Sequence, residues 1–229
     1  IELSPDRVAL FSYAKVPWLK PHQKRMKEED IPDVDEKFAI FLSARKLLTE
    51  EGGYTAIGMD HFAKNQDEIT VALNNKSLHR NFMGYTVQST NHYIGFGVSS
   101  IGYVQQSFIQ NVKTLKDYYQ ALDNDELPVD RGISLNEDDL IRQWVIYSLM
   151  CHFEVDYQKF EDCFQISFTD YFSEEMNELY PFVEDDLIGV TKDQISVKEK
   201  GTLFIRNIAM LFDKYLKNKL KERRFSQTI

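Results

Sequence analysis

The chain has 229 residues, 43% of them hydrophobic, which is enough to bury the core of one large domain or two small ones. Its formal net charge of −9 and its pI near 5.1 predict repulsion of nucleic acids and anionic membranes. Charged residues interrupt every apolar stretch well before the roughly 20 residues that a membrane-spanning helix needs. Composition therefore argues against a disordered chain and predicts a soluble protein without general affinity for nucleic acids or membranes, although it does not exclude a local basic patch.

Cysteine and histidine usage argues against a metal site within the chain. The two cysteines, Cys151 and Cys163, do not form the close pair that binds zinc or makes a redox centre. The five histidines never fall at the close helical spacing of a metal box. We interpret both cysteines as small core residues, and the lack of a disulfide framework favours the cytoplasm. Residue 1 is Ile1 and no secretory signal follows it, so we expect a processed or cut chain.

Strand and helix patterns alternate in the first third of the chain. Short apolar runs at 7–11 and 54–57 predict strands. Apolar residues at helical spacing predict helices over 35–48 and 67–73. Such alternation is typical of a parallel α/β sheet or barrel.

The middle of the chain predicts one more strand over 93–98 and a helix over 115–122. The composition then changes at 123–128, where acidic residues and Pro128 indicate a boundary. We therefore expect a linker over 123–133.

The last hundred residues predict a mostly helical region with one β-hairpin. Ser134 and Glu137 have the spacing of a capping box, and the helix that they open carries an apolar stripe. The pattern resembles a winged helix. The basic residues over 214–224 suit the C-terminal end of a helix, and nucleic-acid contact is the less favoured alternative. The other expected elements are helices at 156–163 and 169–180, hairpin strands at 187–190 and 194–197, and a long helix from Gly201 to Leu216.

Three segments are candidates for chemistry. The run 79–86 crowds polar and aromatic side chains beside a glycine, which suits either a ligand site or an ordinary polar turn. Asp60 and His61 are adjacent, and neighbours on an extended chain point to opposite faces, so we expect no catalytic dyad. The glycine-rich run 95–102 lacks the third glycine of a dinucleotide-binding motif, and a tight turn is the simpler explanation.

Several longer motifs resemble the oxygen-independent coproporphyrinogen III oxidase family of radical S-adenosylmethionine (SAM) enzymes. The resemblance covers essentially the whole chain, and the motifs stand in the family's order. They are Tyr54-Thr-Ala-Ile-Gly-Met-Asp-His-Phe-Ala63, Leu78-His-Arg-Asn-Phe-Met-Gly-Tyr-Thr86, Gly95-Phe-Gly-Val-Ser-Ser-Ile101, Leu115-Lys-Asp-Tyr-Tyr119, Asp138-Asp-Leu-Ile-Arg142, Met150-Cys-His-Phe153 and Arg206-Asn-Ile-Ala-Met210.

The resemblance implies an α/β fold that is the C-terminal half of the family's enzyme. Residues 1–122 would form the closing portion of a partial (β/α) radical-SAM barrel, and 134–229 a winged-helix-like helical domain. The family's C-x3-C-x2-C motif, which holds a 4Fe-4S cluster, is absent from this sequence. We therefore expect a fragment that is inactive alone, whose partner is the N-terminal half of the same polypeptide. The complete enzyme is expected to be monomeric and the fragment, with an open sheet edge, to self-associate.

In the family, SAM cleavage yields a radical that takes hydrogen from a propionate side chain, and carbon dioxide and one electron are then lost. Two propionates of coproporphyrinogen III become vinyl groups, which gives protoporphyrinogen IX in haem biosynthesis. The resemblance places Ile101 against the cluster-bound SAM and Ala14 against a second SAM. It also places Phe82 near the SAM sites, beside Met83, where the family has a glutamine.

The sequence leaves two questions open: which residues bind the substrate carboxylates, and whether the chain has a second, alternative function. Arg80, Arg131 and Arg142 are candidates to bind the carboxylates of the porphyrinogen, although a surface salt bridge is the simpler fate for each. The alternative function is that of a haem- or tetrapyrrole-binding relative resembling the radical SAM chaperones.

Overall fold

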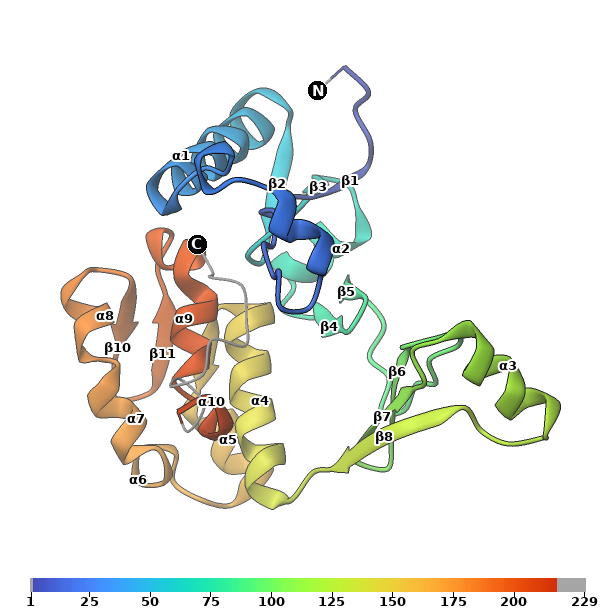
Figure 1. Cartoon of the computed structure of the whole chain (residues 1–229). Helices are drawn as coiled ribbons and strands as arrows, with labels where there is room; N and C mark the ends of the chain where they lie inside the picture. Colours follow the sequence, from blue (N-terminus) through green and yellow to red (C-terminus); the bar gives the residue numbers. More distant parts are fainter. Residues whose placement is uncertain (1, 218–229) are drawn as a thin grey trace.

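The computed structural model describes residues 2–217, which form a mixed α/β fold in three regions (Figure 1). A sheet with two helices forms the N-terminal region, and a second sheet with the helix α3 (Leu115–Asp123) extends to one side. The remaining helices, over residues 137–217, pack together with a third sheet in the C-terminal region. The expected α/β class is confirmed, and no barrel closes within the described residues.

Every strand pair among residues 2–217 is antiparallel, so the expected parallel arrangement is wrong. The reason lies in the connections. Strands β2 (Tyr54–Ile57) and β3 (His61–Lys64) are joined by a three-residue turn, which is far too short for a parallel crossover. Strand β1 (Arg7–Ala9) then pairs with the other edge of β3.

Helix α1 (Val34–Lys46) begins at a complete capping box. The Asp33 carboxylate accepts the Glu36 amide at 2.9 Å, and the Glu36 carboxylate accepts the Asp33 amide at 3.0 Å. A π-helical turn, Leu47–Glu51, continues α1 up to Gly52. Two short 3₁₀ turns, Pro21–Arg25 and Glu28–Asp30, precede it.

A small core joins the N-terminal region to α4 (Glu137–His152). Strands β2 and β3, helix α2 (Glu68–Asn74) and the hairpin of β4 (His79–Asn81) and β5 (Gly84–Thr86) all contribute side chains to it. Its buried members are Ile57, Ala63, Ile69, Ala72, Leu78, Tyr85 and Cys151. Because Cys151 belongs to α4, the hairpin and α4 pack as one unit.

The middle region is a three-stranded sheet of β6 (Ile101–Val104), β7 (Ser107–Asn111) and β8 (Val129–Ser134), with α3 (Leu115–Asp123) beside it. The strand expected over 93–98 is wrong: only Tyr93 pairs there, through one isolated bridge to Tyr103. The side-chain amide of Asn111 instead donates to the carbonyls of Gly95 and Gly97, at 3.1 and 2.9 Å. Gly97 has a positive φ. This bonding produces the tight turn expected for the glycine-rich run. Residues 129–133, expected in the linker, belong to β8.

The first helix of the C-terminal region begins two residues later than its sequence predicts. Asn136 and Asp139 form the capping box of α4, because Ser134 is already part of β8 and bonds Ser107. The helices expected over 169–180 and 201–216 are each broken. At the second break, the Asp213 carboxylate accepts the Tyr215 amide at 2.9 Å and so begins a new helix.

The predicted hairpin of β10 (Ile188–Val190) and β11 (Gln194–Val197) is confirmed, and β9 (Glu154–Asp156) adds a third strand to it. Of the basic tail over 214–224, residues 218–224 lie outside the described part of the chain. The helices of this region are α5 (Tyr157–Phe164), α6 (Phe168–Tyr171), α7 (Ser173–Glu178), α8 (Tyr180–Glu184), α9 (Ile205–Met210) and α10 (Lys214–Lys217), with a 3₁₀ turn at Lys200–Phe204.

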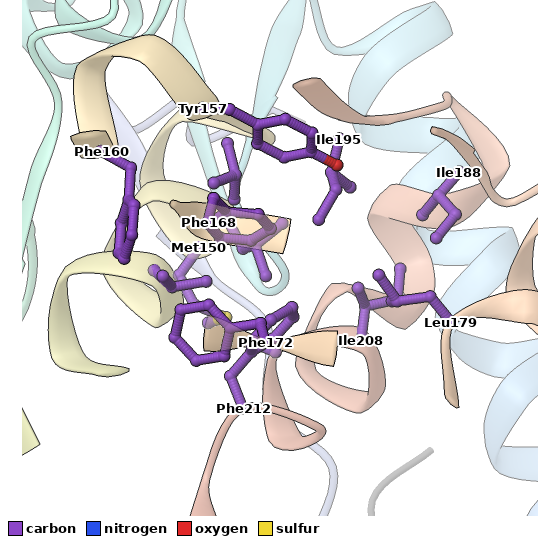
Figure 2. Packing of buried hydrophobic residues seen from close by; sticks show 14 of the residues in the cluster. Met150, Tyr157, Phe160, Phe168, Phe172, Leu179, Ile188, Ile195, Ile208 and Phe212 are labelled. Atoms are coloured by element: carbon purple, nitrogen blue, oxygen red, sulfur yellow. The ribbon is translucent and has the colours of Figure 1, made fainter. Parts of the chain in front are cut away.

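The main core fills the C-terminal region and contains a cluster of aromatic rings among aliphatic side chains (Figure 2). Phe160, Phe168, Phe172 and Phe212 are fully buried, and the ring centroid of each lies within 6.4 Å of those of at least two of the others. Tyr157 stacks on Phe168 at 4.4 Å. This packing holds α4 as the rigid wall on which the candidate site is built. Over residues 2–217, none of the helices has both the length and the hydropathy to cross a membrane.

Candidate functional site

A groove of about 1020 Å³ lies between α4, the β4–β5 hairpin and the β6–β7 hairpin. Its volume is at the upper end of the range for small-molecule sites. Residues of β9, α5 and α10 complete its lining. We call this hollow the groove.

Aromatic rings form one wall of the groove. Phe82, at the tip of the β4–β5 hairpin, meets Phe108 edge to face at 5.4 Å, and Phe108 lies 4.7 Å from Tyr103. Tyr103 in turn lies 6.1 Å from Tyr93. We call these four residues the aromatic wall. Its ring faces suit an extended apolar or aromatic ligand.

Hydrogen bonds from α4 fix the hairpin that carries Phe82. The Tyr147 hydroxyl accepts the Arg80 amide at 2.6 Å and lies 2.9 Å from His79 Nδ1. His152 Nε2 donates to the Leu78 carbonyl at 3.2 Å. These bonds anchor the beginning of β4 directly to α4. A sequence pattern does not show such pairings, because the partners lie more than 60 residues apart.

Burial controls the charge of the groove's titratable rings. It lowers the pKa of His79 and of His152, so both imidazoles are neutral near neutral pH. It raises the pKa of Tyr147, whose hydroxyl therefore keeps its proton and can donate it to His79. The net charge of the groove is consequently set by its lysines, arginines and carboxylates.

We expect the free energy of unfolding to fall as the pH is lowered from about 7 to about 5. The unfolded chain takes up protons on His79 and His152 below the ordinary histidine value of 6.5, whereas the folded chain resists them. The stability that the two neutral histidines contribute is thus present above that pH and is lost below it. Urea titrations at several pH values measure the slope. His152→Gln is expected to reduce it, the exposed control His92→Gln is expected to leave it unchanged, and equal slopes in both variants would contradict the assignment.

The structure places the three expected SAM contacts apart. Phe82 lines the groove, whereas Ala14 and Ile101 do not. Ala14 lies in an exposed loop whose carbonyl accepts a bond from the buried Gln23 at 3.0 Å. Ile101 opens β6 opposite Gln110, and the strand expected just before it, over 93–98, does not form. The described residues therefore do not bring these three positions into one pocket.

Asp60 and His61 do contact each other, which corrects the expectation that they point apart. Asp60 Oδ1 lies 2.5 Å from His61 Nδ1, because Asp60 belongs to the turn before β3 and not to extended chain. The His61 ring packs edge to face against Tyr85 at 5.3 Å and Phe11 at 6.0 Å. The pair lies outside the lining of the groove.

No protein-family model matches the chain. Oxygen-independent coproporphyrinogen III oxidases from Synechocystis and Escherichia coli are 45% and 43% identical to it over its whole length, and the chain spans 50% of each. The oxidase of the same name from Thermostichus vulcanus is 39% identical, and the chain covers 70% of that relative. The chain belongs to the oxygen-independent coproporphyrinogen III oxidase family.

A solved structure confirms this family's fold in the chain. Coproporphyrinogen III oxidase from Escherichia coli, described as a radical SAM enzyme, superposes with a TM-score of 0.88 at 43% identity. The match covers 93% of this chain and 49% of that one. The chain therefore spans about half the length of most of the oxidases that it matches.

The described residues of this family member do not fit an iron–sulfur cluster. Cluster ligands are thiolates, and burial raises the pKa of Cys151 to about 12, so its thiol keeps its proton. Cys163 is exposed on α5, which corrects its expected place in the core. Across residues 2–217, no three His, Cys, Asp or Glu side chains gather as a metal site would need.

Proposed function

We propose that the chain is the substrate-enclosing, C-terminal part of an oxygen-independent coproporphyrinogen III oxidase. The enzyme would convert two propionates of coproporphyrinogen III to vinyl groups and yield protoporphyrinogen IX for haem biosynthesis. The observation that carries this proposal is the 45% identity, over the entire chain, to an oxidase of that name. Each conversion removes one hydrogen atom, one carbon dioxide and one electron from a propionate.

The size and lining of the groove support the proposal, because they match the proposed substrate. A tetrapyrrole is large and mostly apolar, with charged carboxylates at its edge. The volume of about 1020 Å³ and the aromatic wall suit the macrocycle. The buried core behind α4 keeps that helix rigid, and hydrogen bonds from α4 fix the hairpin that carries Phe82, which favours a fixed orientation of the reacting propionate.

Cofactors and partners belong to the same proposal. SAM supplies hydrogen-atom abstraction when bound. We propose Ile101 as a contact to the cluster-bound molecule, Ala14 as a contact to a second molecule and Phe82 as a residue near the SAM sites. Because these positions do not share a pocket here, residues outside this chain would complete both sites. The cluster ligands would come from the length of the relatives that this chain does not cover, and that segment would be its partner.

The arrangement of the chain in the complete enzyme is also proposed. Residues 1–122 would close the radical-SAM barrel, and 134–229 would form the domain over the substrate. The two cysteines are unpaired, which suits a reducing cytoplasm. We expect the complete enzyme to be monomeric and the chain alone to self-associate through the free edges of its short sheets.

The test is a hybrid protein. The N-terminal half of the Synechocystis oxidase is joined to this chain, the cluster is reconstituted without oxygen, and SAM and coproporphyrinogen III are added. We expect protoporphyrinogen IX, measured by chromatography after oxidation, at a rate within about tenfold of the Synechocystis enzyme. The same N-terminal half without this chain is the control and is expected to give no product.

Two outcomes of this experiment would overturn the proposal. The first is a hybrid with full cluster absorbance that cleaves SAM but releases no protoporphyrinogen. The second is stoichiometric retention of haem without SAM cleavage, which would favour a tetrapyrrole-binding module instead.

A further inference from the structure

Five basic side chains line the groove, and four of them have carboxylate partners. Lys76 is paired with Glu154, Lys159 lies 3.7 Å from Asp156, and Lys214 is paired with Asp138 and Asp139. Arg142 donates to Asp138 at 2.9 Å and to Glu175 at 3.0 Å. For Arg80 the structure shows no carboxylate partner within residues 2–217.

The rest of the lining does not neutralise Arg80. His79 and His152 are uncharged near neutral pH, as their lowered pKa values show. Three of the acidic residues in the lining, Asp139, Glu154 and Asp156, are already paired with lysines. The fourth, Asp213, accepts two backbone amides at the start of α10. An anionic ligand would therefore meet one uncompensated cation, at the β4–β5 hairpin.

Arg80 is also held in position. Its backbone amide donates to the Tyr147 hydroxyl, and its guanidinium lies 5.6 Å from the centre of the Tyr85 ring. Tyr85 is buried and pairs with Arg80 across the hairpin. A cation resting on an aromatic face keeps its N–H donors free for a ligand. Phe82 of the aromatic wall lies two residues further along the same hairpin.

The structure separates three arginines that the sequence leaves equivalent. Arg142 is half-buried and also bonds the Phe212 carbonyl at 3.1 Å, so it is fully engaged in holding α4 to α7. Arg131, on β8, donates to Gln110 at 2.9 Å and does not line the groove. Only Arg80 combines a position in the groove with a free guanidinium.

We propose that Arg80 is the carboxylate-binding residue of the groove. Its planar guanidinium would bind a ligand carboxylate through two parallel hydrogen bonds while the aromatic wall contacts the body of the ligand. The inference rests on the proposed function for the source of the carboxylate, which is a propionate of the tetrapyrrole or the amino-acid carboxylate of SAM. Tyr147 acts as a positioning residue, because it holds the Arg80 backbone.

Ligand titration tests the proposal without turnover. The chain is titrated with coproporphyrin III, the stable oxidised form with four propionates, and binding is followed by fluorescence. We expect Arg80→Ala to weaken binding by about ten- to a hundredfold, since a charge-assisted pair of bonds is lost. Arg80→Lys is expected to recover part of the affinity. Arg131→Ala is the matched control and is expected to bind as the wild type does.

Further titrations show which ligand supplies the carboxylate and whether Tyr147 acts through Arg80. The tetramethyl ester of coproporphyrin III should bind equally to wild type and Arg80→Ala, since it has no carboxylate. A loss of SAM affinity alone, measured by calorimetry, would support Arg80 binding SAM instead. Tyr147→Phe should weaken coproporphyrin III binding in the wild type but much less in Arg80→Ala, which a general loss of structure would not produce.

Two results would overturn the proposal. One is equal affinity of Arg80→Ala and wild type for both ligands, with melting temperatures also equal. The other is no measurable binding of either ligand by the wild-type chain. Neither result depends on oxidase activity in the hybrid, so failure of this inference and failure of the proposed function are distinguishable.

Discussion

Replacing Gly58 with alanine is expected to destabilise the folded chain by about 2–5 kcal/mol. Gly58 lies in the turn between β2 and β3 with a φ of +61°, a conformation that L side chains rarely adopt. A Cβ at this position would lie 1.8 Å from the Tyr85 hydroxyl oxygen, so one of the two residues must move. The loss combines backbone strain with steric overlap in a buried site.

The displaced ring matters because Tyr85 joins three parts of the fold. Its hydroxyl donates to the Met150 carbonyl of α4 at 3.2 Å, and its ring packs against His61 of β3. The same ring supports the Arg80 guanidinium. We therefore expect Gly58→Ala to weaken the Arg80-dependent binding of coproporphyrin III in addition to lowering stability.

Gly53 offers a matched control for this experiment. Its φ is +68°, and no neighbouring atom lies within 4 Å of a built Cβ. Gly53→Ala should therefore lower the free energy of unfolding only through backbone strain, by about 1–2 kcal/mol. Urea denaturation of both variants measures the difference. If the two losses are equal, the close approach of Tyr85 to Gly58 does not constrain the fold.

The second large effect is expected from Phe172→Ala, at about 3–5 kcal/mol. The Phe172 ring is fully buried and lies 5.0 Å from Phe168, 5.2 Å from Phe212 and 5.8 Å from Phe160 (Figure 2). Its removal leaves a cavity that neighbouring rings cannot fill without leaving their own contacts. It also removes the ring face beneath Arg142, whose guanidinium lies 5.4 Å away.

Phe96→Ala is the control, because that ring is 85% exposed and its loss should cost less than about 0.5 kcal/mol. Phe172→Leu keeps most of the apolar volume and should recover more than half of the loss. Guanidinium denaturation, followed by the fluorescence of Trp144, reports on this core directly, since Trp144 packs 5.7 Å from Phe160. A Phe172→Ala loss below about 1 kcal/mol would show that the aromatic cluster does not stabilise the C-terminal region.

Local sequence patterns correctly predicted those helices and strands whose formation depends on residues close to one another in the sequence. The strand at Tyr54–Ile57, the helix that became α3 and the β10–β11 hairpin all agree with the structure, because turn residues and apolar spacing decide them. The boundary at Ser134 failed for the opposite reason. A pairing with β7, more than twenty residues away, took Ser134 into a strand and moved the cap to Asn136.

The candidate site was predictable only in part. The segment 79–86 stood out by its composition, and Phe82 does line the groove. Tyr147 and the other three rings of the aromatic wall were missed, since they come from separate stretches of chain that only folding brings together. The Asp60–His61 contact was missed because one turn residue changes the direction of a side chain.

By itself, the sequence determined the family, the α/β class, the absence of a cluster-binding motif from these residues and the local elements, since each depends on residue identity or short-range spacing. Tertiary structure alone decided that all described strand pairs are antiparallel and which arginine is free. Both depend on contacts between distant residues: strand direction on the pairing partner, and the availability of a charge on which carboxylates fold beside it. Arg80, Arg131 and Arg142 are chemically identical in the sequence, and only their neighbours in space distinguish them.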